Sequence, residues 1–350
     1  MPMNHGQFVI SMDFELYWGL RDICPISHYL GHSAKEREII PRVLGLFERS
    51  GIHATWATVG LMFFESKEQM LRGIPTRLPA YQDANLSPYP HLTSGEVGTD
   101  EQTDSSHYGL SLIRLIEQTR YQRVSTHTFS HYYCLEAGQD SAEFQADLRA
   151  AVRIADRQGI QLESIVFPRN QVNSAYLPLL LPEGIRSYRG NPEHWLYKRG
   201  YSTGDSLPRR AFRLMDTYLN LSGFHSYSLE GPKQGEPINL PASHFLRSYS
   251  GKLAILEPLR LRRILKGMTY AARNNQVYHL WCHPYNLVDE QGRNLKLLEE
   301  IIAHYKKLQS LYGMESRNME ELSDQILEVM AAREPQFMMS PMEWSKEMNA

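Results

Sequence analysis

Two carboxylates stand close together near the start of the chain, directly after a short apolar segment. The run FVISM over residues 8–12 is followed by Asp13 and, after one phenylalanine, by Glu15. In an extended chain, residues two positions apart point to the same side, so both carboxylates would face one site. One of them could act as a general base and the other could bind a metal ion. The structural alternative is a helix cap or an exposed acidic pair.

A pair of histidines follows another strand-like segment in the middle of the chain. His127 and His131 stand four residues apart in the run STHTFSH. If this segment is helical, both rings lie on one face and can bind the same ion. The chain has 14 histidines, so such a pair can also arise by chance. Its position directly after a predicted strand favours the functional interpretation.

Two later segments also place polar side chains at the ends of predicted strands. Arg169 follows Phe167-Pro168, where a guanidinium could bind a carboxylate in a bidentate pair or form an ordinary surface salt bridge. His279, Trp281 and His283 alternate along the run HLWCHP and would share one face of a strand. His283 could serve as a general acid beside a metal site, or it could be a core histidine with satisfied hydrogen bonds.

The elements that must position these residues alternate between strands and helices. Helical patterns occur at 110–117, 140–159, 256–272, 295–308 and 319–332, and Pro41 suits the first turn of a helix that stops near Gly51. Strands are predicted over 8–12, 54–59, 123–126, 164–167 and 277–282. This alternation predicts a parallel sheet or barrel, in which functional groups gather where strands end. Residues 72–108 are rich in Pro, Ser, Asp and Gly, and we expect an irregular insertion that caps the site.

Composition excludes several classes of protein. The chain has 37 basic and 39 acidic residues and a net charge of −2, so nothing indicates binding to nucleic acid or to an anionic membrane. No apolar stretch reaches the length of a transmembrane helix, and residues 1–7 lack the pattern of a secretory signal. Three widely spaced cysteines form neither a disulfide framework nor a metal motif. A cytoplasmic enzyme without membrane insertion is therefore expected.

Taken in order, the segments SMDFELYWG, STHTFSHYYC, IVFPRNQ and LWCHPYN resemble the motifs of polysaccharide deacetylases of the NodB-homology type, carbohydrate esterase family four. The resemblance runs from about residue 8 to residue 287. It implies a distorted (β/α) barrel with fewer than eight full strands. The catalytic domain would then span residues 1–312 and include the capping insertion at 72–108, and residues 313–350 would form a helical tail.

The resemblance also implies a metal-dependent hydrolysis of an amide, most simply the N-deacetylation of an acetamido sugar or oligosaccharide in surface-polysaccharide metabolism. Glu15, His127 and His131 would bind one divalent ion, with zinc expected and cobalt, manganese, nickel or iron as alternatives. Two histidines and one carboxylate leave coordination positions for water and substrate, as in catalytic zinc sites.

The same resemblance assigns Asp13 as the catalytic base, Arg169 as the group that holds Asp13, and His283 as the acid. The sequence departs from the family at two of these points. Phe14 separates the two carboxylates, which are adjacent in the usual motif, so either carboxylate could bind the metal. Arg169 follows the proline, whereas the family places its arginine before it.

The expected substrate-binding residues are Tyr17, Trp18, Asn170 and Trp281. The three aromatic rings could stack on a sugar, or they could pack in the core. The family's fourth motif has only candidates here, the run YRGN over residues 188–191 and Trp195. Two rival functions remain open: a metal-independent hydrolase of a non-sugar C–N bond on the same fold, and an inactive carbohydrate-binding protein.

Overall fold

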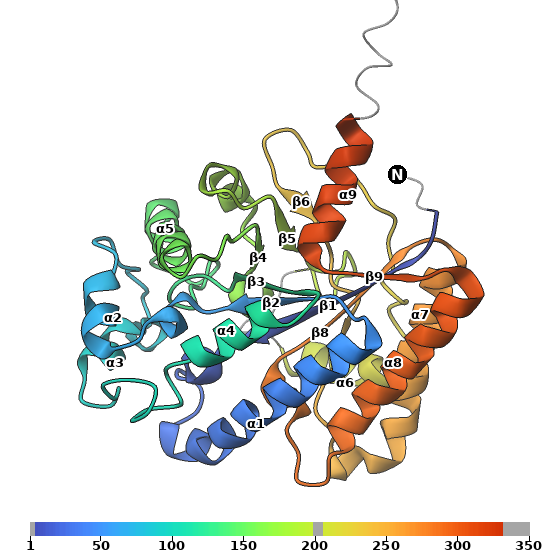
Figure 1. The fold of residues 1–350 in the computed structure, drawn as a ribbon, viewed down its shortest axis with the longest axis horizontal. Helices are drawn as coiled ribbons and strands as arrows, with labels where there is room; N and C mark the ends of the chain where they lie inside the picture. Colours follow the sequence, from blue (N-terminus) through green and yellow to red (C-terminus); the bar gives the residue numbers. More distant parts are fainter. Residues whose placement is uncertain (1–3, 199–205, 332–350) are drawn as a thin grey trace, which may run out of the picture.

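A computed structural model describes residues 4–198 and 206–331 of the chain. Within these ranges the strands form one sheet in the order β6-β5-β4-β3-β2-β1-β8-β7, and β9 pairs with β1 outside this path. The paired strands run parallel, and helices lie around the curled sheet (Figure 1). The distorted (β/α) barrel expected from the sequence is therefore confirmed.

The strands differ in length, from eight residues in β1 to two in β6 and β7. Their bounds are β1 Gln7–Phe14, β2 Ala54–Thr58, β3 Gln122–Thr126, β4 Ser164–Val166, β5 Ser187–Arg189, β6 Ile238–Asn239, β7 His244–Phe245, β8 Val277–Cys282 and β9 Glu315–Arg317.

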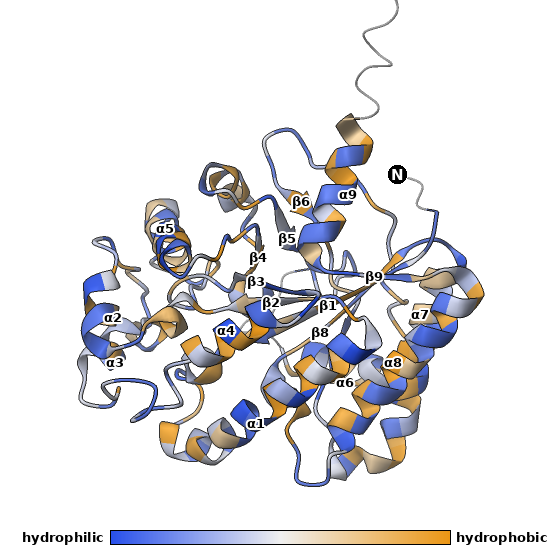
Figure 2. Cartoon of the chain, viewed as in Figure 1, coloured by the Kyte–Doolittle hydropathy of each residue, from blue (hydrophilic) through white to orange (hydrophobic). Residues whose placement is uncertain are grey.

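Helices α1 to α8 lie in the segments between the strands, and α9 follows the last strand (Figure 1). Their bounds are α1 Ile26–Ser50, α2 Lys67–Gly73, α3 Tyr89–Thr93, α4 Leu110–Gln118, α5 Ser141–Arg157, α6 Leu207–Tyr218, α7 Glu257–Arg273, α8 Arg293–Tyr312 and α9 Met319–Ala331. Among the described helices, none combines the length and the apolar character needed to cross a membrane. Polar and apolar residues alternate along helices such as α8, so that one side can face the sheet (Figure 2).

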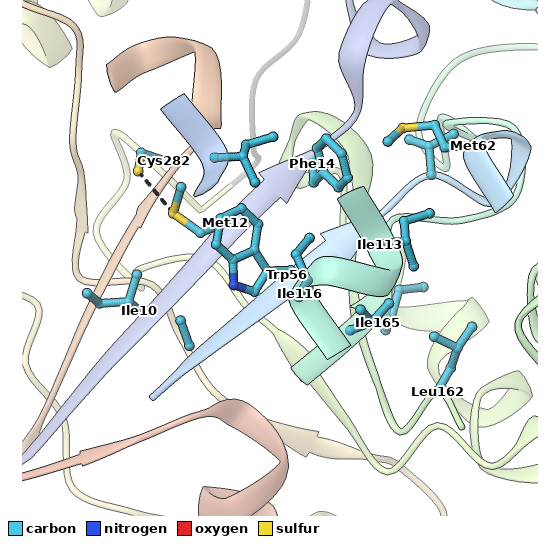
Figure 3. Packing of buried hydrophobic residues seen from close by; sticks show 14 of the residues in the cluster. Ile10, Met12, Phe14, Trp56, Met62, Ile113, Ile116, Leu162, Ile165 and Cys282 are labelled. Carbon is cyan, nitrogen blue, oxygen red and sulfur yellow. Dashed lines mark hydrogen bonds between the residues drawn. The ribbon is translucent and has the colours of Figure 1, made fainter. Parts of the chain in front are cut away.

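Strand β1 separates two different environments because its side chains alternate between the two faces of the sheet. One set of positions enters the main core, where Met12 and Phe14 lie near Trp56 of β2 and Ile113 and Ile116 of α4 (Figure 3). The other set includes Ser11 and Asp13, which bond to polar side chains across the barrel. The amphipathic pattern of β1 thus directs its carboxylate into the barrel.

The predicted strands all form, and the structure corrects one predicted helix. Pro41 was expected in a first turn, but α1 begins at Ile26 and Pro41 lies inside it. The earlier turns bury Tyr29, Ser33 and Glu36, and the Tyr29 hydroxyl donates to Glu36 at 2.7 Å. Two of these buried residues are polar, so the apolar pattern used for the prediction did not include them.

The chain after residue 312 packs on the sheet as far as the structure describes it. β9 pairs with residues 7–9 of β1, before the pairing of β1 with β2 begins at Ile10. Met319, Leu322 and Ile326 of α9 pack with Val9 of β1, on the face opposite to the main core. The expected helical tail of 313–350 thus includes α9, and residues 332–350 lie outside the described residues.

Candidate active site

The two carboxylates lie at the end of β1, inside the mouth of the barrel. Asp13 is in the strand and Glu15 directly follows it, and each side chain is almost fully buried. Gly19 makes room for the second one: a Cβ at this position would lie 2.1 Å from the carboxylate carbon of Glu15. Sequence reasoning did not assign a role to Gly19.

Glu15 lies against both histidines of the HTFSH segment. Its Oε2 is 3.1 Å from Nε2 of His131 and 3.4 Å from Nε2 of His127. One ligand atom from each of these three residues lies within 4.8 Å of the others, and all three side chains are buried. The group that the fold brings together therefore contains Glu15 and both histidines, but not Asp13.

The histidines converge through a strained loop, so the helical geometry considered for this pair is not the one that brings them together. Residues 127–131 are irregular, and Thr128 and His131 have φ values of 63° and 58°. Such left-handed backbone conformations are costly for these residues and persist only where surrounding contacts enforce them. Asp147 of α5 supplies such contacts, because its carboxylate accepts from the backbone N–H groups of Phe129 and Ser130 at 2.7 and 3.1 Å.

The protonation of this group suits a cation. Nδ1 of His127 lies 2.8 Å from the carbonyl oxygen of Val166, so Nδ1 carries a proton and Nε2 is the ring nitrogen that faces Glu15. Burial lowers the pKa of His131 and favours its neutral form. Burial alone would raise the pKa of Glu15, but the neighbouring His283, His127 and His131 outweigh it and hold this pKa well below its usual value. One carboxylate and two imidazole rings, each directing Nε2 at it, form a donor set that fits a divalent transition metal.

Asp13 is held by an arginine that the sequence did not single out. Nη1 and Nη2 of Arg189 lie 2.6 and 2.7 Å from the two carboxylate oxygens of Asp13, in a buried bidentate pair. Arg189 also donates to Ser11 and Asn170, and its guanidinium lies 4.3 Å from the ring centre of Trp281. Burial alone would raise the pKa of Asp13, but Arg189 outweighs it and lowers that pKa.

The expectation that Arg169 would hold Asp13 is wrong. Arg169 bonds to Asp22, and its guanidinium lies over the ring of Tyr133 at 4.2 Å. Both Arg169 and the residue after it have positive φ values of 53°, which turn the chain sharply at the end of β4. In the sequence, Arg189 belonged only to the YRGN run named as a candidate for the family's fourth motif, and the structure shows it as the last residue of β5.

His283 follows β8 and faces both carboxylates. Its Nε2 lies 3.9 Å from Oδ2 of Asp13 and 3.6 Å from Oε1 of Glu15. Its Nδ1 lies 3.0 Å from the side-chain oxygen of Asn286, and its ring stacks on Tyr285 at 4.5 Å. Asn286 therefore fixes a proton on Nδ1 and directs Nε2 towards the site.

The proposed sugar-binding residues are not equivalent in the structure. Tyr17 and Trp18 are buried, and their polar atoms donate to the carbonyl oxygens of Cys24 and His107, so in this structure they offer no open stacking face. Asn170 and Trp281 instead line a cavity of about 570 Å³ that adjoins the Asp13–Arg189 pair. The exposed Trp195 lies outside the cluster formed by the carboxylates and the three histidines.

The chain was compared with protein families, curated proteins and solved structures. No family model matches, and no curated protein matches. A protein from Mycobacterium smegmatis, provisionally assigned as a polysaccharide deacetylase, is similar with a TM-score of 0.58 and 13% identity, covering 94% of this chain and 93% of that one. The GH57-type branching enzyme from Pyrococcus horikoshii gives a TM-score of 0.51 and 12% identity, covering 92% of this chain and 70% of that one. At such identities the likeness concerns the fold alone, and this chain has the distorted (β/α)-barrel fold of the polysaccharide deacetylases.

Proposed function

We propose that this protein is a metal-dependent hydrolase that removes the N-acetyl group from an acetamido sugar. The observation that carries the proposal is the combination, in one buried mouth, of the donor group Glu15, His127 and His131 with the Asp13–Arg189 pair and His283. Each part alone has a structural explanation. Their convergence supplies the three groups that amide hydrolysis needs: a metal site, a base and an acid.

A divalent ion bound by Glu15, His127 and His131 would polarise the amide carbonyl and make water a stronger nucleophile. Glu15 contributes the negative charge of this donor set, and its lowered pKa keeps it ionised at neutral pH. The carbonyl oxygen of Val166 orients His127, so that Nε2 of this ring is available as a donor.

Asp13 accepts the proton of the attacking water. Arg189 keeps its carboxylate ionised and fixed in orientation, while each carboxylate oxygen retains a further lone pair for a water molecule. His283, protonated at Nε2, donates that proton to the departing nitrogen, which cannot leave as an anion. Asn286 holds the other ring nitrogen, so the proton is delivered at the atom that faces the carboxylates.

The two rival functions make different demands on the site. A metal-independent hydrolase would not need two histidines with Nε2 directed at one buried carboxylate. An inactive binding protein would not need an acid, His283, and a base, Asp13, beside this group. A cytoplasmic location remains part of the proposal, supported by the unpaired state of Cys24, Cys134 and Cys282.

The decisive experiment combines metal analysis with acetate release from a panel of N-acetylated sugars and oligosaccharides, with and without added metal. Glu15→Gln should lower metal affinity and be partly rescued by excess metal. Asp13→Asn should retain metal but lose about 10²–10⁴-fold in turnover. If Asp13→Asn is the variant that metal rescues, the two roles are exchanged. If neither change affects acetate release, the site does not perform this reaction.

A further inference from the structure

The cavity beside the candidate site has a strongly basic lining. Five arginines line it, and none of its described lining residues is a carboxylate. It lies between α6, β7 and the ends of β4 and β8, and its volume of about 570 Å³ is typical of sites for small organic ligands. A chain with a net charge of −2 has therefore gathered positive charge at one place.

The cavity adjoins the reacting groups. Trp281 lines it and lies over the guanidinium of Arg189, the partner of Asp13. Phe245 also lines it, stacks on Trp281 at 4.3 Å and meets the ring of His283 edge-on at 6.0 Å. A ligand in the cavity would thus lie against the side chains that contact the acid His283 and the partner of the base, Arg189.

The positive charge is only partly neutralised within the described residues. Arg263 is paired with Asp216, and Arg169 is paired with Asp22. Arg210 and Arg247 have no ion pair to a carboxylate in the described part of the chain. Because at least two cations lack counter-charges there, the cavity favours an anion.

A buried histidine adds a polar atom without a partner. His244 of β7 lines the cavity and is 8% exposed, and its Nε2 has no hydrogen-bond partner within the described structure. Burial holds the pKa of His244 well below its usual value, so the ring is neutral and can carry its proton on Nε2. Such an N–H can donate to an anionic oxygen.

We infer that the substrate carries an anionic group, a carboxylate or a phosphate, which binds in this cavity to Arg210, Arg247 and His244 while its acetamido group lies at the carboxylates. This inference rests on the proposed function for the reaction and adds the chemical class of the substrate. Arginine is suited to both anions because its planar N–H groups match their paired oxygens.

Binding can be tested without turnover. Calorimetry on the full chain would compare glucose 1-phosphate and glucuronic acid with glucose, none of which has an acetamido group. We expect an anionic probe to bind at least tenfold more tightly than glucose, and high salt to reduce that preference. Arg247→Gln and the exposed Arg210→Gln should each weaken its binding about tenfold. Arg153→Gln, at an exposed position on α5, is the matched control and should bind as the wild type does.

The two anionic probes also separate the possible sources of the charge. Tighter binding of the phosphate probe supports a sugar phosphate, and tighter binding of the carboxylate probe supports an acidic sugar. If neither binds better than glucose, or if both arginine variants bind like Arg153→Gln, the inference is overturned. Absence of acetate release with every substrate would instead refute the proposed reaction and leave the binding result intact.

Discussion

Replacing Arg189 with methionine should lower the free energy of unfolding, because it removes the partner of the buried Asp13 carboxylate. Methionine approximates the length of the arginine stem but offers no charge and no donor. Both oxygens of Asp13 would lose their bonds of 2.6 and 2.7 Å, and the carboxylate would remain in a site where it is only 3% exposed. The variant would therefore contain a buried charge without a partner.

The size of the effect follows from this burial. Breaking a buried ion pair by removing one partner costs about 3–5 kcal/mol. At about 2–4 °C per kcal/mol for a chain of this size, the midpoint of thermal unfolding should fall by roughly 6–20 °C. Changing Asp13 to asparagine as well removes the unpaired charge, so the double variant Asp13→Asn/Arg189→Met should recover part of the loss.

The assay is a double-mutant cycle measured by denaturant or thermal unfolding, which requires no substrate. We expect a coupling free energy of at least about 2 kcal/mol between Asp13 and Arg189. The control is a second cycle that combines Asp13→Asn with a change at Arg169, because Arg169 bonds to Asp22 and not to Asp13. Arg169→Met should also lower stability, but its effect should add to that of Asp13→Asn within about 0.5 kcal/mol.

The opposite pattern of couplings would contradict the pairing of Asp13 with Arg189. Strong coupling of Asp13 to Arg169, together with additivity for Arg189, would mean that the resemblance assigned the arginine correctly and that the described pair is wrong. Weak coupling in both cycles would mean that Asp13 is solvated.

Three further predictions concern Gly19 and His283 in the site and Glu36 in α1. Gly19→Ala should lower metal affinity by displacing the carboxylate of Glu15, whereas Gly31→Ala, where no neighbour lies within 4 Å, should not; equal metal content measured by elemental analysis would contradict this. His283→Ala should reduce turnover about 10²–10⁴-fold with unchanged metal content, and loss of the metal would make it a ligand. Burial raises the pKa of Glu36 to about 8, so its protonated form is favoured by folding. The stability that this provides is complete below the unfolded pKa near 4.5 and is lost as the pH rises through about 8. Glu36→Gln should reduce this decline in the free energy of unfolding by about a few kcal/mol, and an unchanged pH profile from denaturant unfolding would contradict this.

The sequence by itself determined the features that depend on local pattern. Alternation along β1 places Asp13 on the face opposite to Met12 and Phe14, and this can be read from residues 8–14 alone. The order of strands and helices likewise predicted a parallel barrel with polar residues where strands end. The family resemblance, rather than the local pattern, named Glu15, His127 and His131 as one group before the fold was known.

Only the tertiary structure decided which partners meet across the barrel. β5 and β1 are separated by three strands in the sheet, and Arg189 reaches Asp13 only because the sheet curls. The histidines converge through two left-handed residues held by a helix that follows in the chain, not through a helical repeat of their own. The basic cavity, too, joins side chains of α6 to those of β7. Sequence spacing carries no information on such distances, because they depend on how distant segments pack together.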